Sequence, residues 1–353
     1  MRGRGASENI PNRFEKIAVS LDPESVVDPS SESSDSGSKR PVRTQFLKDH
    51  SRTILSTNDS PDIGFNASVN PYRGCEHGCA YCYARPTHEY LGFSAGLDFE
   101  SKIVVKENAA ALLREKLMSK SWRPQAVAFS GVTDCYQPIE RKLRLTRSCL
   151  EVLAEFRNPF LIITKNHLIT RDIDLIADMA RDQAAAVFIT ITSLNPELTA
   201  ILEPRTARPA LRLDAVRKLS EAGIPVGVLM APIIPAINDE EIPQVLAAAR
   251  DAGAITAGFT PLRLPGAVLP IFTDWLARHY PDRRDKVLNR IRSIREGQLN
   301  DPNFGSRMRG SGPFAEQIRS IFKVHARRLG LDRGFSPLST AQFRRPGEQM
   351  RLL

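Results

Sequence analysis

Six short apolar segments alternate with helix-length segments through the middle of this chain, and this alternation constrains the fold most. The apolar segments are residues 64–69, 126–130, 160–164, 186–192, 224–231 and 254–259. They are continuous apolar runs, which is typical of parallel strands buried on both faces. Segments with apolar residues at helical spacing lie between them, at 107–119, 139–156, 172–182, 208–222 and 239–252. Strands and helices that alternate in this way predict an α/β fold with a parallel sheet.

Six strand–helix units fit an open, partial TIM-like (βα)6 barrel, which we assign to residues 63–265. In such barrels the functional side chains lie at the C-terminal ends of the strands. After Pro265 the composition changes to Arg-rich helices, predicted at 269–279, 285–295 and 314–329. Residues 266–353 are therefore interpreted as a basic helical extension that packs beside the barrel.

The first 62 residues are rich in Ser, Asp, Arg, Asn and Pro, and we expect a disordered N-terminal segment over 1–62. Residues 30–38 are mostly Ser, and they bury too little apolar surface to offset the entropy lost on ordering. Two short apolar motifs, at 12–15 and 44–47, could still dock on the folded domain.

The sequence predicts a cytoplasmic protein that does not span a membrane. It contains no run of about 18 apolar residues. Its first residues are charged and have no apolar stretch behind them, which argues against a secretory signal. Three of the five cysteines are clustered, a distribution unlike a disulfide framework.

The net charge of +9 is concentrated at the C-terminal end of the chain. From Arg278 onward there are 17 Lys and Arg against 7 Asp and Glu, whereas the preceding residues are close to neutral. A basic segment of this kind favours a polyanionic partner such as nucleic acid. The alternative is a solvated helical face that only aids solubility, and charge alone does not separate the two.

The clustered cysteines, Cys75, Cys79 and Cys82, form a C-x3-C-x2-C array. Thiolates this close together indicate a site for a soft metal. Three thiolates fit a four-iron cluster in which one iron lacks a protein ligand and can bind another molecule. The alternative is a zinc site that adds His77 or His88, although the second C-x2-C knuckle of a zinc ribbon is absent.

The array, with Tyr81 directly before its last cysteine, resembles the signature of the radical S-adenosylmethionine (SAM) superfamily. The resemblance implies a [4Fe-4S] cluster held by Cys75, Cys79 and Cys82, with the open iron chelating the amino and carboxylate groups of SAM. It also implies reductive cleavage of SAM to a 5′-deoxyadenosyl radical that abstracts hydrogen from a substrate. An electron donor such as flavodoxin or ferredoxin would then be a partner.

Within this superfamily, residues 65–265 are most similar to the spore photoproduct lyase-like group. Residues 79–83, Cys-Ala-Tyr-Cys-Tyr, match a lyase segment whose tyrosines are implicated in passing a hydrogen atom, so Tyr81 and Tyr83 are relay candidates. Packing around the cluster and adenine is their alternative role. Residues 129–135 resemble a lyase segment near the SAM methionyl group, which makes Ser130 and Thr133 candidate SAM contacts.

The segment 129–135 also departs from the lyase pattern. Gly131 stands where the lyase has the cysteine that quenches the product radical, which argues against photoproduct repair itself. Cys135, four residues later, is the candidate hydrogen donor, and a small buried filler is its alternative role. Cys149 lies among apolar residues in a predicted helix and is interpreted as core.

The ends of later strands carry further candidates. Lys165 ends the third strand as part of a Thr-Lys pair similar to one in the lyase, whose lysine meets SAM, and a cation suits the SAM carboxylate. Thr190 and Ser193, at the fourth strand, match positions of ribose or carboxylate contacts. Glu203 and Arg205 could together hold substrate or SAM, or form an exposed ion pair of little energy.

The leading hypothesis is therefore a radical SAM enzyme, with a nucleic acid lesion or base as its substrate. The lyase-like segments and the basic C-terminus favour this substrate, and a lesion base would have to leave the stack to reach the barrel. A radical SAM enzyme that acts on a protein or small metabolite is the first alternative. The second is a non-enzymatic zinc-binding module for nucleic acid or protein partners.

Overall fold

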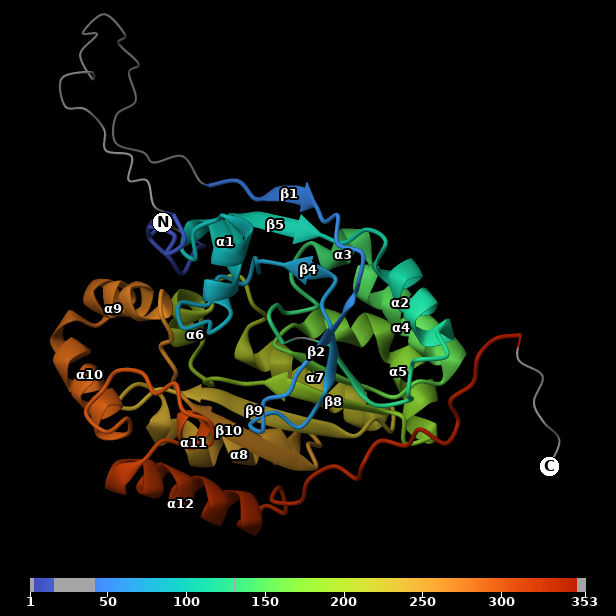
Figure 1. The fold of residues 1–353 in the computed structure, drawn as a ribbon. Coiled ribbons are helices and arrows are strands. Elements are labelled where there is room, and N and C mark those ends of the chain that lie inside the picture. Colours follow the sequence, from blue (N-terminus) through green and yellow to red (C-terminus); the bar gives the residue numbers. More distant parts are fainter. Residues whose placement is uncertain (1–2, 16–41, 130, 348–353) are drawn as a thin grey trace, which may run out of the picture.

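The computed structural model describes residues 3–15, 42–129 and 131–347, and a seven-stranded sheet forms its centre (Figure 1). Six strands pair in parallel and in chain order: β3 (Ala67–Val69), β6 (Val127–Phe129), β7 (Phe160–Thr164), β8 (Ala185–Thr190), β9 (Val226–Ile233) and β10 (Thr256–Pro261). The strand β2 (Leu55–Thr57) adds to the edge, antiparallel to β3. The predicted α/β fold with a partial TIM-like barrel is confirmed.

Helices follow the parallel strands, as the sequence pattern predicts. They are α2 (Ala109–Met118), α3 (Glu140–Leu143), α4 (Leu145–Phe156), α5 (Ile173–Arg181), α6 (Pro196–Leu202), α7 (Pro209–Glu221) and α8 (Ile242–Asp251). The helix predicted over 139–156 is instead two helices, because Arg144 between them adopts a left-handed backbone conformation with φ of 54°. The main hydrophobic core lies between strands and helices and buries Phe129, Ile162 and Val187 completely.

A second, three-stranded sheet includes residues that we predicted to be disordered. Its order is β1 (Gln45–Lys48), β5 (Lys102–Val105) and β4 (Tyr72–Arg73), with β1 parallel to β5. Residues 3–15 also pack on the folded chain. The prediction of disorder over 1–62 is therefore wrong for 3–15 and 42–62, where backbone and polar contacts replace apolar burial, and the rest of that segment lies outside the described residues.

Within its described residues, up to 347, the basic extension forms the α-helices α9 (Val268–His279), α10 (Arg284–Ser293), α11 (Ser306–Arg309) and α12 (Gly312–Arg328). Helix α9 contributes Phe272 and Trp275 to a second core that also contains Cys79. Helix α12 packs on the main core, where the ring of Phe322 lies 4.5 Å from the ring of Phe259. Among the described residues, none of the helices is both long and apolar enough to cross a membrane.

The C-terminal tail after α12 lies against the ends of the barrel helices (Figure 1). The Arg345 guanidinium donates to the backbone oxygens of Leu117, Ser119 and Trp122 at 3.2–3.3 Å. The last carbonyls of a helix lack partners within the helix, and this arginine supplies a donor to one of them in α2, that of Leu117, and to two carbonyls just after the helix. Part of the basic charge in the C-terminal region is therefore structural.

Candidate active site

All three cysteines of the array lie in one loop, residues 74–84, which we call the cysteine loop. Cys75 and Cys79 are buried, and Cys82 is partly exposed. The Cys79 Sγ atom lies 3.9 Å from the Nζ atom of Lys165, which directly follows β7. The loop therefore stands at the C-terminal end of the parallel sheet, where barrels of this type carry their functional residues.

Glycine backbone angles and several backbone hydrogen bonds hold the cysteine loop in shape. Gly74 and Gly78 have φ of 76° and 66°, values that favour glycine. The backbone N–H of Cys75 donates to the oxygen of Phe99 at 2.8 Å. The loop then leads into a 3-10 helix, η1 (Arg85–Leu91).

The donor set fits an iron–sulfur cluster better than a single zinc ion. Zinc needs its ligands at about 2.0–2.3 Å from one point, and among the described residues no three His, Cys, Asp or Glu are arranged to hold one ion. His77 contacts Asp134 and Asn166, and His88 is buried against the rings of two phenylalanines. Three thiols without a histidine are the ligand type of iron–sulfur clusters.

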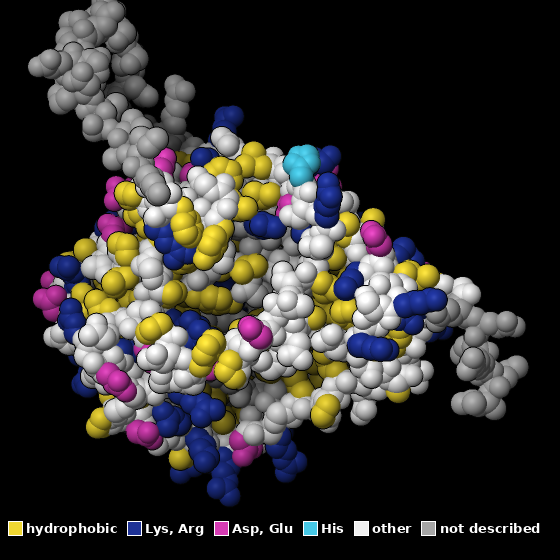
Figure 2. Space-filling view, viewed as in Figure 1, with side chains coloured by type: hydrophobic (Ala, Val, Ile, Leu, Met, Phe, Trp, Pro, Cys, Tyr) yellow, Lys and Arg dark blue, Asp and Glu magenta, His cyan; other side chains and the backbone are white. Residues whose placement is uncertain are grey.

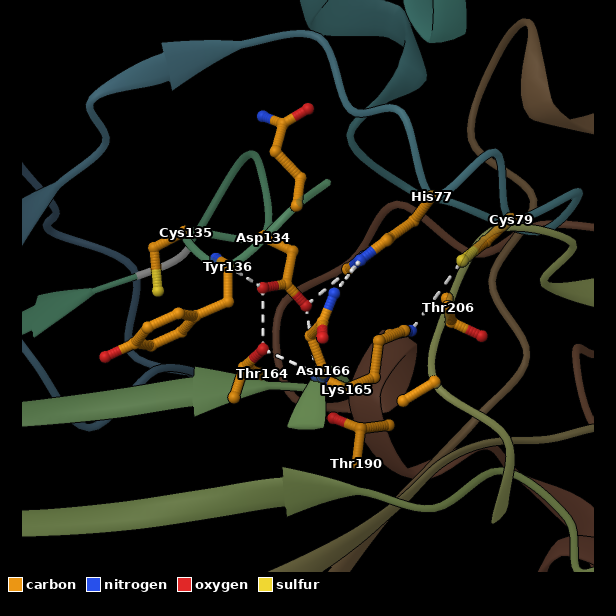
Figure 3. Close-up of polar contacts among 12 residues, drawn as sticks. His77, Cys79, Asp134, Cys135, Tyr136, Thr164, Lys165, Asn166, Thr190 and Thr206 are labelled. Atoms are coloured by element: carbon orange, nitrogen blue, oxygen red, sulfur yellow. Dashed lines mark hydrogen bonds and ion pairs between the residues drawn. The ribbon is translucent and has the colours of Figure 1, made fainter. Parts of the chain in front are cut away.

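Asp134, in the segment after β6, joins the cysteine loop to the end of β7 (Figure 3). Its carboxylate accepts hydrogen bonds from the Thr164 hydroxyl at 2.7 Å and the Lys165 backbone N–H at 3.0 Å, and faces His77 Nδ1 at 3.4 Å. Burial by itself would raise the pKa of Asp134, but His77 and these donors lower it to about 2. The network fixes the segment that carries Lys165 relative to the loop.

Lys165 places its ammonium beside the sulfur of Cys79 in the cysteine loop. Besides Cys79, its ammonium reaches the Tyr81 hydroxyl at 2.9 Å and the carboxylate of Glu203 at 3.4 Å. It also lies 5.1 Å from the centroid of the Tyr81 ring, within range of a cation–π contact. Burial by itself would lower the pKa of Lys165, but Cys79, Tyr81 and Glu203 raise it above its usual range. The side chain is therefore positively charged at neutral pH.

Glu203 is the fully buried centre of this network. Its carboxylate accepts hydrogen bonds from the hydroxyl of Tyr81, the hydroxyl of Thr192 at 2.8 Å and the guanidinium of Arg212. Arg212 is also buried and donates to the backbone oxygen of Thr190 at 3.0 Å. Burial by itself would raise the pKa of Glu203, but the neighbouring cations, Arg212 first among them, lower it below its usual range.

Of the three residues predicted to handle hydrogen, Tyr81 alone lies in the Glu203 network. Tyr83 is 54% exposed, and its hydroxyl donates to a backbone oxygen of the segment after β6 at 2.6 Å. Cys135 is 1% exposed and belongs to the main hydrophobic core. In Figure 3 it lies on the opposite side of Asp134 from Cys79. This position favours the filler role for Cys135.

The predicted SAM contacts lie near the ends of strands. Thr133 is buried, and its hydroxyl donates to a backbone oxygen of β4 at 3.2 Å. Thr190 is buried at the end of β8, and the hydroxyl of Ser193 is buried and donates to Glu241 at 2.6 Å. Ser130 lies outside the described residues. The roles of these residues in SAM binding stay predictions.

Sequence reasoning did not single out Asp134 or Arg212. Asp134 could have been recognised from the sequence, because it is an acidic residue shortly after an apolar strand. Arg212 could not have been recognised in this way, since an arginine within a helix of mixed polar and apolar residues is expected to be exposed. Glu203 and Arg205 do not form the exposed ion pair that was one alternative, because Glu203 is buried and Arg205 instead meets the carboxylate of Glu76 at 3.2 Å. A joint role of the two residues toward substrate or SAM stays a prediction.

Comparison with known families decides what kind of protein this site belongs to. The model of the Radical SAM superfamily matches residues 69–249, which include the cysteine loop and most of the barrel. The chain belongs to the radical SAM superfamily. It is therefore a radical SAM enzyme, and the cofactors of radical SAM enzymes are a [4Fe-4S] cluster and SAM.

Relatives of this radical SAM enzyme occur in distant organisms. An uncharacterized protein of Mycobacterium tuberculosis strain H37Rv is 38% identical over 250 residues, which covers 70% of this chain and 72% of the relative. An uncharacterized protein of Methanocaldococcus jannaschii is 33% identical over 173 residues, which covers 49% of this chain and 62% of that protein.

Among solved structures, the fold is similar to that of spore photoproduct lyase. The lyase complexed with dinucleoside spore photoproduct aligns with a TM-score of 0.55 at 15% identity, over 80% of this chain and 79% of the lyase chain. A mutant form of the lyase gives a TM-score of 0.57 at 16% identity, over 83% of this chain and 85% of the other. At this level of identity the similarity concerns the fold alone.

Proposed function

We propose that Cys75, Cys79 and Cys82 hold the [4Fe-4S] cluster and that the residues around Lys165 bind SAM. The observation that carries this proposal is the ammonium of Lys165 at 3.9 Å from the Cys79 Sγ atom, at the C-terminal end of β7. When bound, the cluster and SAM supply a 5′-deoxyadenosyl radical that abstracts a hydrogen atom from the substrate. An electron donor such as flavodoxin or ferredoxin would reduce the site.

The charge balance around Lys165 suits the carboxylate of SAM. Arg212 and Lys165 together face the single carboxylate of Glu203, so, apart from the sulfur of Cys79, this largely buried place holds one positive charge more than it holds carboxylates. A buried charge is costly unless it is paired, and a ligand carboxylate would pair it. Thr133, Thr190 and Ser193, with Ser130, are the proposed hydroxyl contacts.

The two tyrosines of the cysteine loop are suited to different tasks. The Tyr81 hydroxyl is committed to Glu203, and its ring lies beside Lys165. We therefore assign Tyr81 to positioning these groups. Tyr83 is half exposed near the end of β6, so it is the better relay candidate if a hydrogen atom is passed to the substrate.

Replacing Lys165 tests the SAM site. We expect Lys165→Ala to weaken SAM binding to the cluster-loaded protein about 10- to 100-fold, because a charge-assisted hydrogen bond to a carboxylate contributes about 1.5–3 kcal/mol. Equilibrium dialysis with labelled SAM gives the dissociation constant. Lys323→Ala, at an exposed lysine of α12, is the control. Equal affinity of the two variants for SAM would show that Lys165 does not contribute to the SAM site.

For the substrate, we propose a nucleic acid with a damaged or modified base other than the spore photoproduct. Lys and Arg side chains gather over α11 and α12 (Figure 2). The exposed ones include Arg309, Lys323, Arg327 and Arg328. Similarity to the fold of spore photoproduct lyase, which has been solved with a dinucleoside lesion, supports this substrate class.

An aromatic side chain stands next to this basic surface. Phe304 is 61% exposed, and the guanidinium of Arg307 lies 4.2 Å from the centroid of its ring. Exposed aromatic side chains such as Phe304 are platforms on which unpaired bases stack. Arg263, at the end of β10, contacts the sulfur of Met308 at 3.2 Å and so connects α11 with the C-terminal end of the barrel.

Charge reversal on α11 and α12 tests this substrate class. We expect Arg309→Glu with Lys323→Glu to weaken binding of a labelled single-stranded DNA of about 12 nucleotides roughly tenfold at low salt. The slope of log affinity against log salt should fall by about 1.4, since each phosphate contact to a single strand contributes about 0.7. Fluorescence anisotropy measures both quantities.

The control for this test reverses two charges elsewhere, at the exposed residues Lys120, in the turn after α2, and Arg181, at the end of α5. Lys120→Glu with Arg181→Glu changes the net charge equally and should alter the affinity much less. Equal losses in both double variants, or no binding at low salt, would favour the alternative of a protein or small-metabolite substrate.

A further inference from the structure

Residues 3–15, which we call the N-terminal strap, lie directly against the cysteine loop although about 70 residues separate them in sequence. A Cβ atom on Gly5 would lie 1.9 Å from the backbone oxygen of Gly78 and 3.0 Å from the backbone nitrogen of Ala80. The backbones therefore approach so closely that only glycine fits. The same holds at Gly96, where a Cβ atom would lie 2.2 Å from the oxygen of Glu8.

One buried carboxylate ties the strap to the loop. Glu100 accepts hydrogen bonds from the backbone N–H groups of Gly5 at 3.1 Å and Ala6 at 2.9 Å. The same carboxylate pairs with Arg85, and both side chains are fully buried. Arg85 in turn donates twice to the backbone oxygen of Cys79, from Nε at 3.0 Å and Nη2 at 2.9 Å. The strap, Glu100, Arg85 and the Cys79 peptide thus form one continuous network.

A second set of contacts fastens the strap to the C-terminal extension. The Ser7 hydroxyl donates to Asp274 at 2.9 Å, and Arg278 donates to the backbone oxygen of Gly5 at 3.1 Å. Asp274 and Arg278 both belong to α9. Ala6 packs in a small apolar cluster with Ile271 of the same helix. The strap is therefore wedged between α9 and the cysteine loop.

Arg4 fastens the strap from a third side. Its guanidinium donates to the backbone oxygen of Val42 at 2.9 Å and the Thr44 hydroxyl at 3.0 Å, and also to the backbone oxygen of Glu100. Arg4 is 9% exposed. These contacts join residues before β1 to the same place, so the strap is held along its length rather than at one point.

We propose that the N-terminal strap holds the cysteine loop in its cluster-binding conformation and shields the bound cluster from solvent and dioxygen. Glu100 and Arg85 are positioning residues, because they act on Cys79 through its backbone. This inference rests on the proposed function in one respect, namely that the cluster is bound by Cys75, Cys79 and Cys82. Detachment of the strap would expose the loop backbone at Gly78 and release the carboxylate that orients Arg85.

Over-packing the strap tests the shielding. The test variant is Gly5→Ala. Its control is Gly64→Ala, because nothing lies within 4 Å of a carbon added at Gly64. Both variants are loaded with iron and sulfide in the absence of oxygen. After exposure to air, the visible absorbance of the cluster should decay about tenfold faster in Gly5→Ala, since an added methyl that cannot fit favours local opening. Equal decay in Gly5→Ala and Gly64→Ala would overturn the shielding role.

A second test uses the metal-free protein and so does not depend on the cluster. Trypsin can cut after Arg4 only when that side chain leaves its buried site, and mass spectrometry follows the cut. Arg278→Ala removes a strap contact without touching the cysteine loop, and we expect it to speed this cut about fivefold or more. Arg319→Ala, which breaks an ion pair on α12, is the control and should leave the rate unchanged.

The two tests separate the strap from the proposed function. An unchanged rate of cutting after Arg4 in Arg278→Ala would overturn the proposal that the contacts with α9 hold the strap in place. A faster rate supports this proposal even if Gly5→Ala fails to fold. If the wild-type protein takes up no iron and sulfide, the proposed function fails, while the trypsin result still reports on the strap. Faster cutting in Arg278→Ala, together with faster decay of the cluster absorbance in Gly5→Ala, supports both the attachment of the strap and its shielding of the cluster.

Discussion

Cys79→Ala is expected to abolish the iron–sulfur cluster and SAM cleavage together. Anaerobically purified wild-type protein should hold about four irons and four sulfides per chain, and the variant close to none. Formation of 5′-deoxyadenosine from SAM and dithionite should fall below detection, because Cys79 supplies one of only three thiolate ligands. Iron and sulfide analysis and chromatography of the nucleoside products measure the two effects.

The matched control for Cys79→Ala is Cys149→Ala. Cys149 is fully buried in α4 within the main core, away from the cysteine loop. This control should keep its iron and its SAM cleavage and lose only some stability from the cavity that it leaves. Zinc in place of iron, or a Cys79→Ala variant that retains the cluster, would contradict the assigned ligands. Cys135→Ala adds a useful comparison, since the core position of Cys135 predicts an intact cluster.

Glu203→Gln is expected to cause the largest loss of stability among the polar substitutions of the site. It keeps the size of the side chain but leaves the buried Arg212 guanidinium and the Lys165 ammonium without a carboxylate. Breaking a buried ion pair by removing one partner costs about 3–5 kcal/mol, because the remaining charge is uncompensated. Urea denaturation, monitored by circular dichroism, gives the free energy of unfolding.

The control for Glu203→Gln is Glu316→Gln on α12. Glu316 pairs with Arg319 at 3.0 Å, and its side chain is 64% exposed. Exposed ion pairs of this kind contribute about 0–1 kcal/mol, so the control should stay within 1 kcal/mol of the wild type. Similar unfolding free energies for the two variants would show that the Glu203 network is not the buried, charge-paired centre described above.

Local patterns in the sequence predicted the barrel well. The strand over 160–164 has the predicted bounds, and the other five parallel strands lie within a few residues of theirs. Continuous apolar runs identify such strands because burial on both faces leaves no polar positions. The helix over 139–156 was predicted without its break, because nothing in the apolar spacing marks the left-handed angle of Arg144.

The N-terminal region shows where local patterns fail. Composition predicted disorder over 1–62, yet β1 pairs with β5 and residues 3–15 pack on the cysteine loop. These segments contribute few apolar side chains, and backbone hydrogen bonds and close glycine contacts hold them instead. Such contacts join residues more than 50 positions apart, so no local window of the sequence contains both partners.

The sequence by itself determined the parallel α/β barrel, the three cysteines that make up the proposed cluster site, and the membership in the radical SAM superfamily. Each of these follows from short-range features of the sequence, namely its apolar periodicity and the fixed spacing of its thiols. Only the tertiary structure decided which charges meet: Lys165 with Cys79, Arg212 with Glu203, and the N-terminal strap with Glu100. Burial removes competing water from these groups and makes their pairing necessary, but which partner is available depends on how distant segments fold together.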